Sequence, residues 1–167
     1  MGSGKSSLTK IIKDLEDGYV TSFSSVIRKV IIELDLQPTR ELMQATGDFF
    51  REFDKLVWTK QVLKEIKNIN KTCIIEGIRY PFERDELAAQ GFIILKLIAN
   101  EDIRRQRIEN RNQMTIDDKT WLSWTNHSTE QYVDQIKAEY ILRNNDSQEM
   151  LFHSTVKILH ELKEKLK

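Results

Sequence analysis

The chain has 167 residues, a length typical of one domain whose core is large enough to fold without disulfides or structural metals. Lysine plus arginine and aspartate plus glutamate number 26 each, so no net field is available to hold a nucleic-acid backbone or an acidic membrane. Any anion-binding site must therefore be local. The single cysteine, Cys73, excludes an internal disulfide and a cysteine-rich zinc site, and it is typical of a reducing compartment.

The sequence carries no signal for a membrane or for export. No apolar run approaches the roughly 18 residues of a membrane span, and the first residues lack the basic-then-apolar layout of a secretory signal. We therefore expect a cytoplasmic protein without a membrane partner. Because the sequence has no repeat and no Pro/Gly-rich linker, we expect one continuous domain over residues 1–167, as a monomer or a weak dimer.

The first segment is a glycine- and serine-rich turn at residues 2–7 that leads into a helix. Leu8, Ile11, Ile12 and Leu15 follow at the spacing of one buried helical face. The sequence therefore predicts a turn that feeds directly into a helix N-terminus.

Beyond this helix, apolar runs typical of buried strands alternate with segments typical of helices. The predicted strands are 19–23, 72–75, 92–98 and 139–142. The predicted helices are 26–34, a segment from 38, 54–69, 81–89, a segment from 100, a segment around 121–124 and a closing segment from about 147. Strands that alternate with helices favour an α/β fold with a parallel sheet flanked by helices.

Gly4, Lys5 and Ser6 fit the second half of the pattern Gly-x-x-x-x-Gly-Lys-[Ser/Thr]. In that pattern backbone N–H groups wrap phosphates, the lysine reaches the β and γ oxygens, and the hydroxyl binds Mg²⁺. The first glycine of the pattern would lie two residues before Met1, and its strand would lie further upstream. We therefore expect a sheet that lacks its first, usually central, strand. The alternative is that residues 2–7 are a flexible linker.

Two charged residues follow the predicted strand 72–75. Glu76 lies at the C-terminal end of this strand, the place where open α/β sheets bind ligands. A carboxylate there can assist Mg²⁺ through water, and the alternative is a carboxylate held by a helix terminus. Arg79 lies three residues later, where its guanidinium could bind an acceptor phosphate or form a surface ion pair with Glu83.

Arg104, Arg107 and Arg111 share one face of a predicted helix because they lie three and four residues apart. Three cations on one face could neutralise charge on a phosphoryl group in transfer. The alternative is a solvated face whose arginines pair with neighbouring carboxylates. Arg105 lies on a different face, and we interpret it as a bystander.

Arg28, Arg40 and Arg51 lie in the predicted helical region 25–69, with Gly47 between the last two. Each arginine singly favours a surface position, whereas together they are consistent with an acceptor pocket lined by cations. Gly47 would allow close approach of the backbone.

Aromatic and histidine residues give weaker signals. Trp121 and Trp124 are three residues apart on one predicted helix and could either clamp a base or pack locally. His127, His153 and His160 show no metal-ligand spacing, so we expect any metal to arrive with a nucleotide.

Several segments together resemble the P-loop nucleoside monophosphate kinase superfamily, and the resemblance spans nearly the whole chain. The segments are Gly4-Lys5-Ser6, residues 75–79, Arg104-x-x-Arg107-x-x-x-Arg111 and residues 138–145. The branches that the chain resembles most are dephospho-CoA kinases and phage-type deoxynucleoside monophosphate kinases.

The resemblance implies a three-layer P-loop kinase domain that uses ATP and Mg²⁺, with acceptor-binding helices at about 25–69 and a lid at about 104–125. Catalytic candidates are Lys5, Arg104, Arg107 and Arg111. Cofactor-binding candidates are Gly2, Ser3, Gly4, Lys5, Ser6, Ser7 and, near the adenine, Asn144, with Ser6 and Glu76 for the metal. Acceptor-binding candidates are Arg28, Arg40, Gly47, Arg51 and Arg79.

The expected activity is transfer of the γ-phosphoryl group of ATP to a small nucleotide-type acceptor. A (deoxy)nucleoside monophosphate is favoured because Ser24-Ser25 stands where a dephospho-CoA kinase would carry an aspartate-containing turn. Dephospho-CoA kinase-like activity and a non-catalytic nucleotide-binding protein are the alternatives. A GTPase switch is disfavoured because Asn70-Lys71-Thr72-Cys73 lacks the aspartate of the guanine-reading motif, and no nucleic-acid partner is expected.

Overall fold

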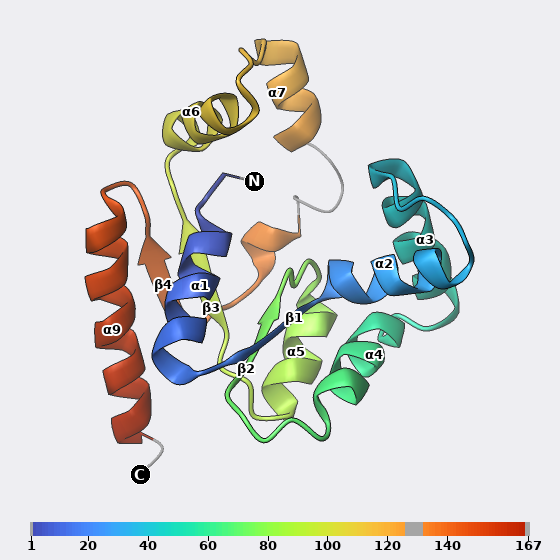
Figure 1. The fold of residues 1–167 in the computed structure, drawn as a ribbon, viewed down its shortest axis with the longest axis horizontal. Helices are drawn as coiled ribbons and strands as arrows, with labels where there is room; N and C mark the ends of the chain where they lie inside the picture. The colour runs from blue at the N-terminus through green and yellow to red at the C-terminus, as the bar shows by residue number, and fades with distance from the viewer. Residues whose placement is uncertain (1, 126–131, 166–167) are drawn as a thin grey trace.

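The computed structural model describes residues 2–125 and 132–165 and contains two pairs of parallel strands (Figure 1). Strand β1 (Tyr19–Ser22) pairs with β2 (Cys73–Glu76), so that Ser22 lies opposite Glu76. Strand β3 (Leu95–Ile98) pairs with β4 (Tyr140–Arg143), so that Ile98 lies opposite Arg143. Each pair therefore ends at a common C-terminal edge.

Helices fill the chain between and after these strands. Their bounds are α1 (Lys5–Glu16), α2 (Phe23–Glu33), α3 (Arg40–Phe53), α4 (Val57–Ile66), α5 (Pro81–Ala89), α6 (Glu101–Asn112), α7 (Asp118–Thr125) and α9 (Gln148–Lys165), with a short 3-10 helix η1 (Val133–Gln135). Figure 1 shows α1 and α9 beside β3 and β4, whereas α2, α3 and α4 lie on the far side of β1 and β2. Helices α6 and α7 extend beyond the strand ends, near the N-terminus.

Hydroxyl groups set the start of α2. Ser22 accepts a hydrogen bond from the Ser25 backbone N–H at 2.9 Å, and the Ser25 hydroxyl accepts one from the Ser22 N–H at 3.0 Å. This reciprocal cap starts the helix at Phe23. The predicted strand 19–23 therefore ends one residue early, and the helix predicted at 26–34 begins three residues earlier, at Phe23.

Most of the buried apolar residues of the described chain belong to two cores and one smaller cluster. One core joins α2, α4, α5 and their neighbours through Phe23, Val26, Ile27, Ile31, Trp58, Val62, Leu87, Ile94 and Ile136. The other joins α1, β4 and α9 through Leu8, Leu142, Leu151 and Ile158. A third, smaller cluster of Ile108, Ile116 and Trp121 lies under α6 and α7. The predicted lid region thus has a small core of its own.

The expected α/β class with parallel strands flanked by helices is confirmed. Across residues 2–125 and 132–165 no hydrogen bonds join β2 to β3, so the four strands form two pairs and not one continuous sheet. None of the helices in the described parts of the chain is both long and apolar enough to cross a membrane.

Candidate functional site

The glycine-rich turn before α1 is held against two other parts of the chain. Gly2 and Gly4 have φ angles of 73° and 92°, a conformation that favours glycine. A Cβ on Gly2 would lie 2.5 Å from the backbone oxygen of Arg104 on α6, and a Cβ on Gly4 would lie 2.1 Å from Nδ2 of Asn144. Asn144 is buried and donates a hydrogen bond from Nδ2 to the Ser3 carbonyl at 2.7 Å. The loop after β4 therefore fixes the shape of the turn.

Lys5, the first residue of α1, forms an ion pair with the end of β2. Its Nζ lies 3.0 Å from Oε2 of Glu76, and the hydroxyl of Thr9 donates a hydrogen bond to the other carboxylate oxygen. The Lys5 side chain is 51% exposed and the Glu76 side chain 17%. Glu76 is the last residue of β2, so it lies at the C-terminal edge of the strand pair. The glycine-rich turn places Lys5 next to it.

A cavity of about 430 Å³ opens beside Glu76. It is lined by Ser6, Thr9, Lys10, Lys13, Asp14, Val20 and Glu76. The Ser6 hydroxyl and the Glu76 carboxylate are hard oxygen donors, which Mg²⁺ prefers, and the first N–H groups of α1 can bind an anion. The residues present therefore fit Mg²⁺ and nucleotide phosphates.

The predicted lid arginines lie in three different environments on α6. Arg107 donates from Nη1 to the Asn144 carbonyl at 2.9 Å, so it supports the loop that holds the glycine turn. Arg104 packs with its guanidinium 5.7 Å from the ring of Trp121, and its buried Nε makes no hydrogen bond within residues 2–125 and 132–165. Arg111 is exposed and contacts its neighbour Asn112.

Arg105, interpreted from the sequence as a bystander, joins α6 to α7. It donates from Nη1 to Asp118 at 2.6 Å and from Nη2 to the Ile116 carbonyl, and it also pairs with Glu109. The side chain of Trp121 is buried in the cluster under these helices and donates to Glu101. The side chain of Trp124 and residue His127 lie outside the described part of the structure.

Among the acceptor candidates, Arg51 on α3 is the most strongly engaged. Its side chain is 13% exposed, and its guanidinium lies 3.0 Å from Oε1 of the fully buried Glu83 and 4.7 Å from the ring centre of Tyr80. A Cβ on Gly47 would lie 3.2 Å from Nη1 of Arg51, and the Gly47 carbonyl accepts the Nε1–H of Trp58 at 2.9 Å. Gly47 is therefore buried between Arg51 and Trp58, where its missing side chain leaves room for the guanidinium.

The other acceptor candidates are more dispersed. Arg79 is partly buried in the turn between β2 and α5, three residues after Glu76. Arg28 on α2 and Arg40 at the first position of α3 are exposed. The structure thus brings Lys5, Ser6 and Glu76 together, links Asn144 and Arg107 to them, and ties Arg51 to the turn that carries Arg79.

Two residues of the site escaped the sequence reasoning. Thr9 lies one helical turn after Lys5, and this spacing was a usable signal for a second contact to Glu76. Glu83 appeared only as a surface partner for Arg79, yet it is fully buried. Its place at the third position of α5, where a carboxylate caps a helix, was the available signal.

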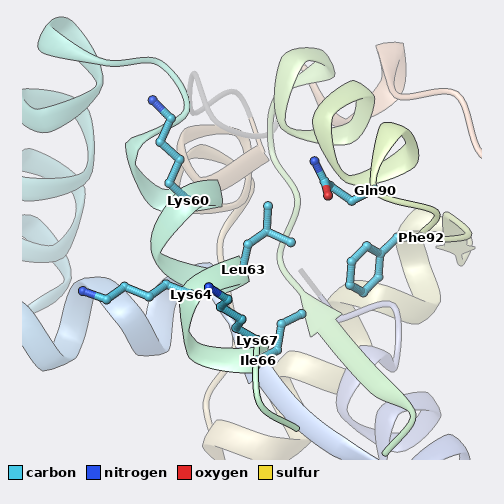
Figure 2. A pocket seen from close by; sticks show the side chains of 7 residues that line it. All are labelled: Lys60, Leu63, Lys64, Ile66, Lys67, Gln90 and Phe92. Atoms are coloured by element: carbon cyan, nitrogen blue, oxygen red, sulfur yellow. The ribbon is translucent and has the colours of Figure 1, made fainter. Parts of the chain in front are cut away.

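A larger cavity of about 570 Å³ lies away from this chemistry, between α4 and the turn that follows α5. Figure 2 shows Leu63 and Phe92 facing one another across it, while Lys60 and Lys64 extend outward. It contains none of the predicted site residues and no carboxylate. The smaller cavity, which combines a hydroxyl, a lysine and a carboxylate, is the better candidate for phosphate chemistry.

A Gly-Lys-Ser turn at a helix N-terminus, facing the acidic end of a parallel strand, is the phosphate-binding arrangement of P-loop proteins. The model of the family described as AAA domain matches residues 1–134, and the chain therefore belongs to this family of P-loop nucleotide-binding proteins. Among curated proteins, none matches the chain.

Proposed function

We propose that this protein is an ATP-dependent kinase that transfers the γ-phosphoryl group to a nucleotide-type acceptor, with a (deoxy)nucleoside monophosphate as the favoured substrate. The observation that carries the proposal is that Glu76 pairs with Lys5 and lines one cavity together with Ser6. Arg79, on the turn that leaves the same strand end, supplies a cation on the acceptor side.

Residues at the start of α1 and at the end of β2 would share the binding of phosphates and metal. Lys5 and the first N–H groups of α1 hold the phosphates, while Ser6 and Glu76 hold the cation. When bound, ATP would supply the phosphoryl group and Mg²⁺ would neutralise part of its charge. Because Glu76 pairs with Lys5 in this structure, Lys5 must exchange the carboxylate for a phosphate oxygen when a nucleotide binds.

The helices α6 and α7 would serve as the lid of the site. Arg104 and Arg111 bring positive charge to α6, and Arg107 connects the helix to the Asn144 loop. Closing such a lid excludes water, which protects the phosphoryl group from hydrolysis.

Two alternatives remain in competition with this function. A non-catalytic nucleotide-binding protein is supported by the absence of hydrogen bonds between the two strand pairs in residues 2–125 and 132–165. Dephospho-CoA as acceptor would use the same donor site and differ only on the acceptor side.

The test is ATP consumption with Mg²⁺ against a panel of deoxynucleoside and ribonucleoside monophosphates plus dephospho-CoA. We expect ADP formation that depends on one acceptor class and falls by at least about 100-fold in Lys5→Ala. Lys157→Ala, which removes an exposed lysine on α9, is the matched control and should keep wild-type activity. ATP binding without turnover on any acceptor would support the non-catalytic alternative instead.

A further inference from the structure

We propose that Glu83 is a positioning residue of the acceptor site: its buried carboxylate fixes the acceptor helix α3 and the Arg79 turn relative to each other. This inference rests on the proposed kinase function and deepens it, because it assigns the geometry of the acceptor side to one residue. Glu83 itself is too deeply buried to touch an acceptor.

The carboxylate of Glu83 binds two separate parts of the chain, one with each oxygen. Oε1 accepts hydrogen bonds from Nε and Nη2 of Arg51 at 3.3 and 3.0 Å. Oε2 accepts the backbone N–H groups of Arg79 and Tyr80 at 3.0 and 3.3 Å. Four donors therefore converge on one side chain that has no exposed surface.

The surroundings of Arg51 restrain its guanidinium further. It lies over the ring of Tyr80, and its Nη1 is 3.4 Å from Oδ1 of Asp48. A guanidinium already engaged by two carboxylates and a ring is poorly placed to bind an acceptor phosphate as well. Arg51 therefore acts through Glu83 and not by a contact of its own, whereas the proposed phosphate contact is that of Arg79.

The position of Glu83 in the fold explains why its contacts affect the acceptor site. Helix α3 packs against α2 and α4, all within the first core, whereas Arg79 stands on the turn that leaves β2 at Glu76. The Glu83 carboxylate is a polar bridge between that helix layer and the turn. Because the same turn begins at the metal-binding candidate Glu76, a shift of Arg79 changes the distance between acceptor and donor.

The decisive variant is Glu83→Gln, which keeps the shape of the side chain but turns one acceptor oxygen into a donor. The amide must then face either Arg51 or the two backbone N–H groups with its own N–H, so one half of the bridge breaks. We expect the KM for the acceptor to rise by about 10- to 100-fold while the KM for ATP changes less than about twofold.

The chain offers a matched control in Glu139. Its carboxylate also accepts from an arginine, Nη2 of Arg84 at 2.5 Å, and from a backbone N–H, that of Ile94 at 2.8 Å. It lies just before β4, at the opposite end of the strands from the site. Glu139→Gln should leave both KM values within about twofold of wild type.

Circular dichroism and thermal unfolding must first show that each variant is folded. Should Glu83→Gln fail to fold, Arg51→Lys replaces it, since lysine keeps the charge but loses the two-pronged contact with Oε1. The same selective rise in acceptor KM is expected there. A variant whose unfolding temperature falls while both KM values stay at wild type would reduce Glu83 to a structural residue and overturn the inference.

The outcomes separate this inference from the proposed function. An active wild type whose Glu83→Gln or Arg51→Lys variant raises the acceptor KM alone supports both. An active wild type whose variants raise both KM values equally, or neither, overturns the role of Glu83 only. A wild type that phosphorylates no member of the panel overturns the kinase and, with it, the acceptor role of Glu83.

Discussion

Replacing Gly4 by alanine is the sharpest test of how the phosphate-binding turn is built. The new methyl group would lie 2.1 Å from Nδ2 of Asn144, where carbon and nitrogen ordinarily approach no closer than about 3.5 Å. The amide must therefore move by more than about 1 Å, and its 2.7 Å hydrogen bond to the Ser3 carbonyl breaks. The residue must also hold a φ of 92°, which an alanine resists.

The two costs can be estimated separately. The left-handed backbone costs an alanine about 1–2 kcal/mol relative to glycine. Leaving the buried Asn144 amide without its partner costs about 1–3 kcal/mol. Together they predict that Gly4→Ala lowers the free energy of unfolding by about 2–5 kcal/mol. ATP binding should weaken in parallel, because the displaced turn carries the N–H groups of the phosphate site.

Urea unfolding measures these costs, with Gly91→Ala as the matched control. Gly91 has a φ of 86° but no atom within 4 Å of its would-be Cβ, so its substitution isolates the backbone cost. In an Asn144→Ala background, Gly4→Ala should lower the free energy of unfolding only by the backbone cost measured with Gly91→Ala, because the clash with the Asn144 side chain is gone. Equal losses for Gly4→Ala and Gly91→Ala in the wild-type background would refute the claim that Asn144 shapes the turn.

Two further predictions concern the helices that would bind the acceptor. Glu65 accepts hydrogen bonds from Lys29 at 2.8 Å and from Tyr19 at 2.8 Å, and the Lys29 contact holds the pKa of Glu65 below its ordinary value of 4.5. A lowered folded-state pKa stabilises the fold above the ordinary value, so Glu65→Gln should cost about 1–2 kcal/mol at pH 7. The difference should shrink as the pH falls below the ordinary pKa of 4.5 and through the lowered pKa of the folded state; a pH-independent difference in urea unfolding would contradict this. Trp58→Phe should cost about 1–3 kcal/mol by the same measurement, because the Gly47 carbonyl loses its 2.9 Å hydrogen bond inside the core; an unchanged unfolding free energy would show that another donor replaces the indole.

The sequence predicted all four strands to within a few residues, because short runs of β-branched and aliphatic residues between helical patterns leave few alternatives. The predicted strand 92–98 is the exception in its first half. The Phe92 N–H bonds to the Leu87 carbonyl, so it completes the end of α5, and pairing with β4 starts only at Leu95. An apolar run indicates burial but does not show which backbone groups form hydrogen bonds. Strand boundaries are therefore predicted less accurately than the strands themselves.

Sequence patterns predicted the local part of the site better than its long-range part. Lys5 and Ser6 stand in one motif, and Glu76 in a strand-end position with a known direction, so their meeting followed from the fold class. The partner of Arg51 did not follow, because Glu83 lies 32 residues away on another helix and no local spacing links the two. The contacts of Arg105 with Asp118 and with the Ile116 carbonyl did not follow either, since these two partners belong to the next helix and its preceding loop.

The pairing of Lys5 with Glu76 also bears on how fast a nucleotide arrives. A cavity walled by one sign of charge attracts an anion from a distance, and added salt weakens that attraction. Here the Lys5 ammonium and the Glu76 carboxylate lie 3.0 Å apart and largely cancel each other. Besides Glu76, the charged residues that line the cavity are Lys10, Lys13 and Asp14, which leave one positive charge. The association rate constant for ATP should therefore vary little with ionic strength, and the affinity of the site should be set mainly by residence time.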